Sequence, residues 1–376
     1  MMTNNLSELV AWRHHFHQHP EVSNFEFETT AYIKQLLSSW GVRLVPTTLT
    51  TGVIAEVGDA SKGPTIALRA DIDALPITEA TGATYTSVNT GVMHACGHDF
   101  HQTALLGSAF ELKQNEAELQ GLIRFIFQPA EETHTGADDV IAAGHIDDVQ
   151  AIVGFHNKPD LQVGEVGILK GGLMAAVDQF KVTFTGIGTH AAMPQLGNDP
   201  IVALSTTIST LQTIVARNVD PQQTAVVSVT HIAGGSTWNV LPESAWFEGT
   251  IRTFTNETRA LSKQRFYDIV NGQAQAFGLK VVIDWSKGPD VTENDPVLTE
   301  IVSDETSKFL KVVKPAPSNA GEDFATFSQK IPGVFVFFGS HGTADWHHPD
   351  FDVDDAALPL AVEWYTRIAT RLLREI

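Results

Sequence analysis

The segment 93–101 contains the residues of this chain that are best suited to chemistry, because it gathers one thiol and three imidazoles within nine positions. Cys96 is the only cysteine of the sequence, and a single glycine, Gly97, separates it from His98. A thiolate with two or three imidazoles suits a borderline-soft divalent ion, and the glycine allows a turn that directs both side chains to one point. The segment therefore predicts a metal site.

Three further segments offer imidazoles or carboxylates. They are Gln128-Pro129-Ala130-Glu131-Glu132, Gly154-Phe155-His156-Asn157 and Trp346-His347-His348-Pro349. Each comes after an apolar run typical of a buried strand, and residues 65–68 form a similar run before Arg69-Ala70-Asp71. Sites in open α/β sheets lie beyond the carboxyl ends of the strands. We therefore expect these segments to converge on one buried centre.

The dipeptide Glu131-Glu132 indicates what such a centre could do. Adjacent side chains at an irregular strand exit point in different directions, so one carboxylate can bind a metal ion while the other reaches only a metal-bound water. Hydrolysis at a metal needs a Lewis acid and a base, and this pair could supply a ligand and the base. The alternative for the pair taken alone is a solvated acidic turn.

The composition is that of a globular protein whose partners are small molecules. Of 376 residues, 43% are apolar, and 24 Lys and Arg against 44 Asp and Glu give a net charge of −20. This charge repels nucleic acid and anionic lipid. The sequence starts without the features of a signal peptide, and no apolar run reaches the ~18 residues of a membrane helix. We therefore expect a cytoplasmic protein without an internal disulfide.

Strands and helices are expected to alternate up to about residue 175, which is the pattern of a mostly parallel sheet covered by helices. One helix is predicted over residues 26–40, ended by Gly41, and another over residues 99–113, with Asp99 as its N-terminal cap. We interpret the histidines of the run 13–21 as solvated, or as residues that contact the metal ligands without binding the metal themselves. A metal site in that run would leave the strand-end cluster unexplained.

The order of elements changes in the middle of the chain. Residues 178–287 predict a β-α-β-β-α-β order, which is a self-contained split βαβ unit. The expected architecture is therefore an α/β catalytic metal domain with a mostly parallel sheet, formed by residues 1–177 and 288–376. Residues 178–287 would form an inserted, ferredoxin-like α+β domain that acts as a lid or in dimerisation.

Five motifs together resemble the M20 metallopeptidase family. They are Arg69-Ala70-Asp71-Ile72-Asp73-Ala74-Leu75-Pro76, His94-Ala95-Cys96-Gly97-His98-Asp99, Gln128-Pro129-Ala130-Glu131-Glu132, Gly188-Thr189-His190-Ala191-Ala192-Met193-Pro194 and Gly321-Glu322-Asp323-Phe324. The chain is most similar to the aminoacylase-like branch, with its hippurate hydrolases, auxin-conjugate hydrolases and N-acetyldiaminopimelate deacetylases. The resemblance spans almost the whole chain in the expected order.

The resemblance implies roles for individual residues. The metal ligands would be Cys96, His98, Glu132, His156 and His347, with His348 as the alternative to His347. Glu131 would be the general base. In the inserted domain, His190, Asn239 and Arg252 match family residues that contact the substrate, and His190 would be donated in trans within a homodimer.

Two positions depart from the family pattern. Arg69 stands where other branches have a histidine ligand, so the Asp71 motif is expected to orient the site and not to bind metal. Lys158 follows His156-Asn157 where an aromatic residue is common, which bears on the acyl-side specificity.

The implied function is hydrolysis of the amide bond of N-acyl L-amino acids, with an acetyl or aromatic acyl group, by two divalent ions. Mn or Zn are expected, with Ni or Co as alternatives. A metallo-dipeptidase or carboxypeptidase is the alternative among hydrolases. From other classes, a Cys96 nucleophile with His98 as base would not need Glu132 or His347, and a non-catalytic metal-binding protein would not need Glu131.

Overall fold

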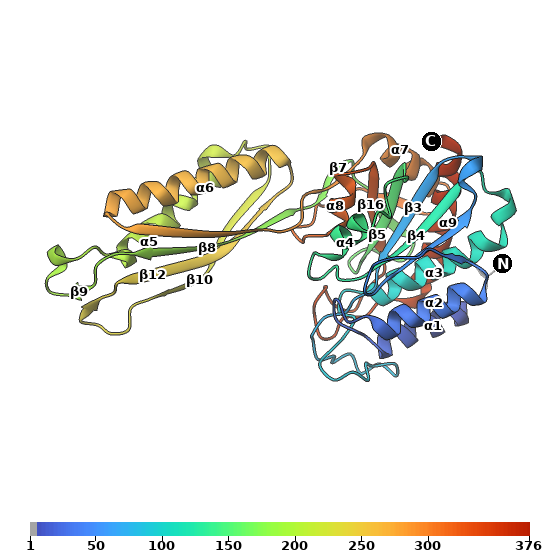
Figure 1. Cartoon of the computed structure of the whole chain (residues 1–376), viewed down its shortest axis with the longest axis horizontal. Helices are drawn as coiled ribbons and strands as arrows, with labels where there is room; N and C mark the ends of the chain where they lie inside the picture. Colours follow the sequence, from blue (N-terminus) through green and yellow to red (C-terminus); the bar gives the residue numbers. More distant parts are fainter. Residues whose placement is uncertain (1–5) are drawn as a thin grey trace. The chain divides into compact units, whose positions relative to one another are not determined.

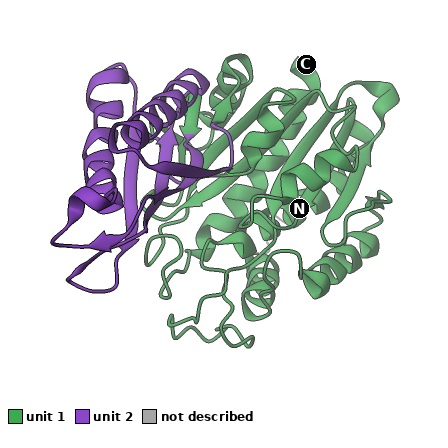
Figure 2. Ribbon diagram, turned by 60° about the vertical axis from the view of Figure 1, so that its left-hand side comes forward, with its two compact units in different colours: residues 1–173, 292–316, 322–376 green, residues 174–291, 317–321 purple. Residues whose placement is uncertain are grey.

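The computed structural model describes residues 6–376, and the chain divides into two compact units (Figures 1 and 2). Unit 1 comprises residues 6–173, 292–316 and 322–376 of the described chain, and unit 2 comprises residues 174–291 and 317–321. The predicted insertion, residues 178–287, falls within unit 2. The short segment 317–321, which also belongs to unit 2, had no signal in the sequence.

Unit 1 is built around an eight-stranded sheet with the order β1-β2-β4-β3-β5-β16-β6-β15. The strands are β1 Arg43–Leu44, β2 Val53–Gly58, β3 Thr65–Asp71, β4 Leu122–Gln128, β5 Ala151–Lys158, β6 Glu165–Gly167, β15 Lys311–Val313 and β16 Gly333–Gly339. The neighbours β4, β3, β5 and β16 run parallel, whereas β1, β2 and β6 each pair antiparallel with a neighbour. The mostly parallel sheet is thus confirmed for the central strands.

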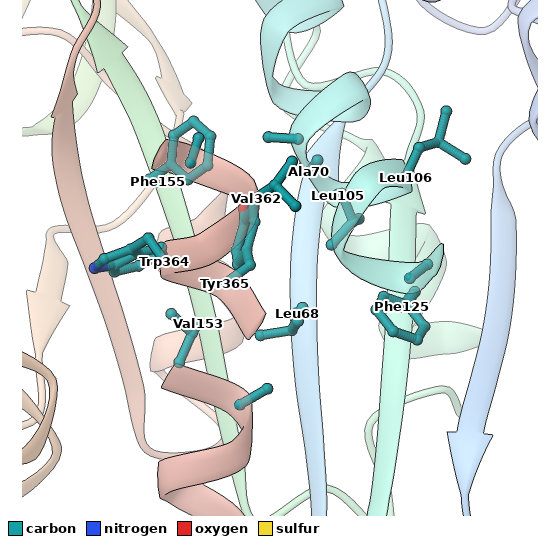
Figure 3. Packing of buried hydrophobic residues seen from close by; sticks show 14 of the residues in the cluster. Leu68, Ala70, Leu105, Leu106, Phe125, Val153, Phe155, Val362, Trp364 and Tyr365 are labelled. Carbon is teal, nitrogen blue, oxygen red and sulfur yellow. The ribbon is translucent and has the colours of Figure 1, made fainter. Parts of the chain in front are cut away.

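The central strands are buried along their length, which explains why their sequences are continuous apolar runs. The helices of unit 1 are α1 Leu6–Gln18, α2 Phe27–Ser39, α3 His98–Gln114, α4 Gly136–Ala142, α7 Pro296–Thr306, α8 Phe324–Ser328 and α9 Leu358–Glu375. α3 and α9 pack against each other and against β3. Figure 3 shows Trp364 and Tyr365 of α9 beside Phe155 of β5. No helix within residues 6–376 is long and apolar enough to cross a membrane.

The start of α3 differs from the prediction. The helix begins at His98, Gly97 occupies the N-cap position with a φ of 81°, and Asp99 already lies in the first turn. The Asp99 carboxylate accepts a hydrogen bond from Arg13 Nε at 3.0 Å and lies 2.9 Å from His17 Nδ1. The predicted Asp99 cap is therefore wrong, because buried partners on α1 engage the carboxylate in place of the local capping bond.

Unit 2 has the predicted order β-α-β-β-α-β and a four-stranded antiparallel sheet in the order β10-β12-β8-β13 (Figure 1). Its elements are β8 Ala176–Thr185, α5 Pro200–Leu211, β10 Ala225–Gly234, β12 Ser244–Thr253, α6 Asn256–Phe277 and β13 Lys280–Lys287. Alternate residues of β8 are buried, among them Phe180 and Phe184, as expected for a sheet with one covered face. Two short ladders pair β9 Thr189–His190 with β11 Val240–Leu241, and β7 Gly171–Met174 with β14 Thr292–Asn294.

Candidate metal centre

The five residues predicted as ligands come together in unit 1. The donor atoms of Cys96, His98 and His156 all lie within 4.8 Å of one another, and the same holds for Cys96, Glu132 and His347. Cys96 Sγ is 3.4 Å from His156 Nε2, and Glu132 Oε1 is 3.8 Å from His98 Nε2 and 3.5 Å from His347 Nε2. His156 lies on β5, Glu132 follows β4 and His347 follows β16, whereas Cys96 precedes α3 and His98 begins it. The donor atoms converge as expected from the sequence.

Gly97 makes the tight turn between Cys96 and His98 possible. Its φ of 81° lies in the left-handed region, and a Cβ at this position would lie 2.4 Å from Nδ2 of Asn157. The same amide donates a hydrogen bond to the carbonyl oxygen of Cys96 at 2.6 Å. A larger residue at Gly97 would therefore displace both the turn and the amide that anchors Cys96.

The two buried histidines of the centre are oriented by hydrogen bonds at their other nitrogen. His156 Nδ1 lies 2.8 Å from the carbonyl oxygen of Asn157, and His98 Nδ1 lies 3.2 Å from a carboxylate oxygen of Asp73. A carbonyl oxygen can only accept, so His156 carries its proton on Nδ1 and presents an Nε2 lone pair to Cys96. His98 is held for the same purpose by Asp73.

The donor set fits a divalent cation. His98 Nε2 and Glu132 Oε1 are buried and have no hydrogen-bond partner among residues 6–376. Unpaired buried polar atoms cost free energy, and a bound cation would satisfy both. Burial alone would lower the pKa of His98, but Asp71 and Asp73 outweigh it and raise this pKa to about 10. The site therefore favours positive charge at Nε2, which a proton or a metal ion can supply.

Asp73 is a part of the centre that was not singled out as a site residue from the sequence. It is buried, and one oxygen faces His98 while the other accepts the backbone N–H of Glu132 at 3.0 Å and the hydroxyl of Ser23 at 2.7 Å. One carboxylate thus positions two of the candidate ligands. Its only sequence signal is the Asp-x-Asp spacing after β3, since both aspartates leave the same strand end.

Glu131 faces different surroundings from Glu132. Its Oε1 accepts the backbone N–H of Asp323 at 3.2 Å, and the side chain is 5% exposed. Burial and the carboxylates of Glu322 and Glu132 raise the pKa of Glu131 well above its usual range. Ala130, which precedes Glu131, has a φ of 54° and turns the chain after β4. Glu131 and Glu132 therefore have different surroundings, although both lie close to His98.

His101 and Arg69 support the centre without offering free donors. His101 Nδ1 lies 2.6 Å from Asp71, and His101 Nε2 accepts the backbone N–H of Asn157 at 2.9 Å, so both ring nitrogens are engaged. Arg69 is fully buried and forms ion pairs of 2.7–2.9 Å with Asp71, Glu322 and Asp323. Arg69 is thus neutralised by three carboxylates and holds Asp71 in place, and the expectation that the Asp71 motif orients the site stays a prediction.

Among the histidines of the run 13–21, His17 supports the centre, beside Arg13, which also binds Asp99. His17 is buried, with Nδ1 2.9 Å from Asp99 and Nε2 3.2 Å from Glu79. Burial alone would lower the pKa of His17, but the two carboxylates outweigh it and raise the pKa to about 9. Asp99 directly follows His98, so a charged imidazole on α1 fixes the first turn of α3 that carries this ligand.

His347 faces the centre and His348 does not. The His347 backbone N–H donates to the carbonyl oxygen of Ala95 at 2.8 Å, which anchors the loop next to Cys96. His348 Nδ1 accepts the backbone N–H of Asp350 at 3.2 Å and lies away from Glu132. The geometry therefore favours His347 of the two candidates.

The residue that departs from the family pattern, Lys158, lies beside an aromatic side chain of the centre. Its ammonium is 4.6 Å from the ring centroid of Trp346, and the Trp346 ring lies 4.6 Å from that of His156. Lys158 also forms an ion pair of 2.9 Å with the exposed Asp160. Lys158 thus makes a cation–π contact with Trp346 at the position where an aromatic residue is common.

The three predicted substrate contacts lie in unit 2. His190 and Asn239 adjoin the β9–β11 ladder, where the Ala191 backbone N–H donates to the Asn239 carbonyl oxygen at 3.0 Å. The His190 side chain is exposed, and Nδ1 accepts the backbone N–H of Ala192 at 3.1 Å. Arg252 lies on β12, and burial lowers the pKa of its guanidinium.

Comparison with known proteins identifies what the chain is similar to. The sequence profile of Peptidase family M20/M25/M40 matches residues 67–371. N-acetyl-L-cysteine deacetylase of Bacillus subtilis (strain 168) is 52% identical over 367 residues, which cover 97% of this chain and 88% of that protein. N-acetylcysteine deacetylase of the same organism is 43% identical, with 98% of each covered. The solved structure of the Bacillus subtilis YXEP protein, described as a dinuclear metal-binding peptidase from the M20 family, has a TM-score of 0.90 and 41% identity over 99% of both chains.

Proposed function

The chain belongs to peptidase family M20/M25/M40, and from this premise we propose that it hydrolyses the amide bond of N-acyl L-amino acids to a carboxylic acid and a free amino acid. It is a metal-dependent hydrolase of linear amides. The observation that carries the proposal is the convergence of thiol, imidazole and carboxylate donors around Cys96, with the carboxylate of Glu131 beside them. Because both Bacillus subtilis relatives are named as deacetylases of N-acetylcysteine, an N-acetyl group is our first choice of acyl group.

Two divalent ions would be held by the five donor residues Cys96, His98, Glu132, His156 and His347. Five donors exceed the four that one tetrahedral ion takes, and the YXEP protein is described as dinuclear. A thiolate among imidazoles and carboxylates suits Mn or Zn, with Ni or Co as alternatives. When bound, such ions polarise a carbonyl group and lower the pKa of water.

Glu131 is our candidate for the general base. Its Oε1 is held by the Asp323 N–H, which fixes the side chain and leaves Oε2 available for proton transfer. In this role it takes a proton from the attacking water and later passes it to the leaving amine. Asp73, which holds both His98 and Glu132, keeps those ligands in place during the reaction.

His190, Asn239 and Arg252 would contact the substrate. Because a backbone N–H donates to His190 Nδ1, the proton of this ring is on Nε2, which can donate to a developing oxyanion. The Arg252 guanidinium has no ion pair or hydrogen bond to any other residue of the described range 6–376, so its planar fork is free for the carboxylate of the amino-acid half. Asn239 adjoins the ladder that carries His190 and would add an amide contact.

We further propose that the chain acts as a homodimer through unit 2, with His190 of each chain serving the metal centre of the other. β10 and β13 are the outer strands of the unit 2 sheet, and both expose apolar side chains, namely Ile232 and Val282. Open sheet edges pair readily, and a two-fold axis would exchange the two His190 loops. The alternative is that His190 serves its own chain after domain closure.

The surroundings of Cys96 do not suit the Cys-nucleophile alternative. Burial and the carboxylates of Glu132 and Glu131 raise the pKa of the Cys96 thiol well above its usual range, whereas nucleophilic cysteines are activated by a lowered pKa. A purely metal-binding protein would not need a second carboxylate, Glu131, next to the ligands. A dipeptidase or carboxypeptidase would use the same centre, so only its substrates distinguish it from an N-acyl-amino-acid hydrolase.

Substrate and metal can be tested in one experiment. The metal-free protein is reloaded with Mn, Zn, Co or Ni and assayed against N-acetyl amino acids, N-aroyl amino acids and dipeptides. We expect N-acetyl amino acids to give the highest kcat/KM and chelators to abolish the activity. A preference for dipeptides would replace the proposed substrate class, and active protein without stoichiometric metal in elemental analysis would exclude the mechanism.

Mixing inactive variants tests the exchange of His190. Glu131→Gln and His190→Ala should each be nearly inactive, but a mixed dimer has one site with both residues intact. After random exchange half of the dimers are mixed, so roughly a quarter of the wild-type activity should return. If no activity returns under conditions in which labelled subunits are seen to exchange, His190 does not act across the dimer.

A further inference from the structure

His347 differs from the buried candidate ligands in the segment that carries it. It lies in residues 340–354, which follow β16 and contain no helix or strand. Its side chain is 52% exposed, whereas those of His98 and His156 are buried. The position of His347 beside Glu132 therefore depends on the contacts that hold residues 340–354, here called the His347 loop.

The two ends of the His347 loop are tied together. The Asp354 backbone N–H donates to the carbonyl oxygen of Ser340 at 2.8 Å, and the Thr343 backbone N–H donates to the carbonyl oxygen of Asp352 at 3.0 Å. These bonds close the base of the loop. A group that binds this base therefore influences the position of the whole loop.

Arg13 of α1 binds the base of the loop and the start of α3 at the same time. Its Nη2 donates to the Asp352 carboxylate, and its Nη1 donates to Asp355 at 2.6 Å and to the carbonyl oxygen of Val353 at 3.2 Å. Its Nε donates to Asp99, in the first turn of α3, at 3.0 Å. The Arg13 side chain is 1% exposed, so these bonds are shielded from water. A single guanidinium thus connects two segments that are far apart in the chain.

This contact requires an arginine and not merely a positive charge. Three carboxylates converge on the guanidinium, one from Asp99 on α3 and two from Asp352 and Asp355 at the base of the loop. Each of the three nitrogens serves a different carboxylate, and the planar guanidinium fork offers donors in these separate directions. A lysine would keep the charge, but its single ammonium nitrogen could not bind all three carboxylates in this arrangement.

Tyr85 and His14 add further contacts between α1 and the base of the loop. The Tyr85 hydroxyl donates to Asp352 at 2.5 Å, and the Tyr85 ring centroid lies 5.3 Å from the guanidinium carbon of Arg13. The Tyr85 and His14 rings are stacked with their centroids 3.5 Å apart, and His14 Nε2 lies 2.9 Å from Asp355. Because these contacts remain when Arg13 is replaced, the loop should be displaced and not released.

The two segments that Arg13 connects carry ligands on either side of one carboxylate. His98 directly precedes Asp99, and Glu132 Oε1 lies 3.8 Å from His98 Nε2 and 3.5 Å from His347 Nε2. We propose that Arg13 is a positioning residue of the metal centre, which holds the His98 and His347 side chains within reach of a shared ion. This inference rests on the ligand set of the proposed function.

Metal affinity measures this role without any assay of activity. The metal-free full chain is titrated with Zn²⁺ in competition with a chelator of known affinity. Arg13→Lys should still bind two ions, one of them roughly 10–100-fold more weakly, which is the range for residues that hold metal ligands in place. Arg124→Lys is the matched control, since Arg124 is also buried and binds Glu56, Asp148 and the carbonyl oxygen of His145, none of which neighbours a candidate ligand in the sequence. It should bind both ions with unchanged affinity.

Further variants separate positioning from a general loss of stability. In a chain that already carries His347→Ala, Arg13→Lys should weaken metal binding less than in the unsubstituted chain, because the loop no longer supplies a ligand. Asp352→Asn weakens the contact only at the loop, and should lower the affinity by a smaller factor than Arg13→Lys. With Co²⁺ in place of Zn²⁺, the visible absorption bands report the ligand geometry and should change in Arg13→Lys but not in Arg124→Lys. Circular dichroism of the metal-free variants checks that they are folded.

Three results would each overturn the proposal. The first is unchanged affinity for both ions in Arg13→Lys and Asp352→Asn, and the second is a loss in Arg124→Lys as large as that in Arg13→Lys. The third is an effect of Arg13→Lys that is the same with and without His347. A chain that binds two ions but does not hydrolyse N-acyl amino acids would refute the proposed function, and the affinities would still decide the role of Arg13.

Discussion

Replacing Glu26 tests how the loop with the two central carboxylates is held. Glu26 is fully buried at the start of α2, where Oε1 accepts the backbone N–H of Ala130 at 2.8 Å and Oε2 accepts the hydroxyl of Thr51 at 2.7 Å. Ala130 has a φ of 54°, in a region that costs an L-residue about 1–2 kcal/mol. The bond from Ala130 to Glu26 opposes relaxation of this turn, and Glu131 follows directly.

The expected effects of substitution differ between stability and rate. A hydrogen bond to a charged group contributes about 1.5–3 kcal/mol, so Glu26→Ala should lose roughly 3–6 kcal/mol and Thr51→Val about half of that. Only Glu26→Ala frees the Ala130 turn. Because a displacement of about 1 Å can lower a rate by about a hundredfold, we expect kcat to fall at least roughly tenfold in Glu26→Ala, with KM little changed. Thr51→Val should leave kcat within about twofold, since its bond does not touch the loop.

The assay combines thermal unfolding, kcat and KM on an N-acetyl amino acid, and metal content, all from the same preparations. Glu26→Gln serves as a control, because the amide keeps an acceptor oxygen for Ala130 and should retain most of the kcat. The reasoning is refuted if Thr51→Val lowers kcat as much as Glu26→Ala does. It is also refuted if Glu26→Ala is less stable and yet has an unchanged kcat.

Three further predictions concern the centre, the substrate and the pH. Glu131→Gln should keep its metal and lose roughly a hundredfold or more in kcat, whereas Glu132→Gln should also lose metal, and equal metal loss in elemental analysis would reverse the two roles. Arg252→Ala should raise KM for free acids, and its role fails if the unsubstituted enzyme hydrolyses the methyl ester of a good substrate as well as the acid. The pKa of His17 rises from 6.5 to about 9 on folding, so its stabilisation is present below pH 6.5 and is lost as the pH rises through 9. This amounts to at most about 3 kcal/mol, and a flat unfolding free energy across this range, or an equal slope in His17→Gln, would contradict it.

The convergence of the ligands was predictable because it depends on a regular feature. Buried strands read as continuous apolar runs, and parallel strands end at one edge of a sheet, so the residues after each run meet there. Glu131, which follows β4, and His156, which lies near the end of β5, are examples. Gly97 was predictable as well, because a tight turn between two donors requires a left-handed residue.

The contacts that hold the ligands in place were harder to predict from the sequence, because the residues that form them are far apart in the chain. Asp99 at a helix start has the pattern of a cap, and nothing local indicates that Arg13 on another helix pairs with it. Asp73 belongs to a motif with Asp71, but only the fold shows that its carboxylate holds both His98 and Glu132. Such contacts depend on packing, which a pattern along one segment does not encode.

The discontinuous course of unit 1 bears on how the protein is synthesised. β5 pairs with β16 in the register Ile152↔Gly333 to Lys158↔Gly339, so this edge of β5 lacks its neighbour until the last part of the chain has been translated. The four-stranded sheet of unit 2 is already finished at Lys287. At 5–20 residues per second, roughly 3–10 s of synthesis separate Lys287 from Gly339, the last residue of β16.

We therefore expect unit 2 to fold on the ribosome while β5 of unit 1 still has an unpaired edge. Ribosome-bound chains that end near residue 320 should yield a protease-resistant fragment of unit 2 and retain no metal. Chains extended beyond α9 should gain both metal and resistance in unit 1. Early resistance of residues 6–173 would show that the first segment closes its sheet without β16.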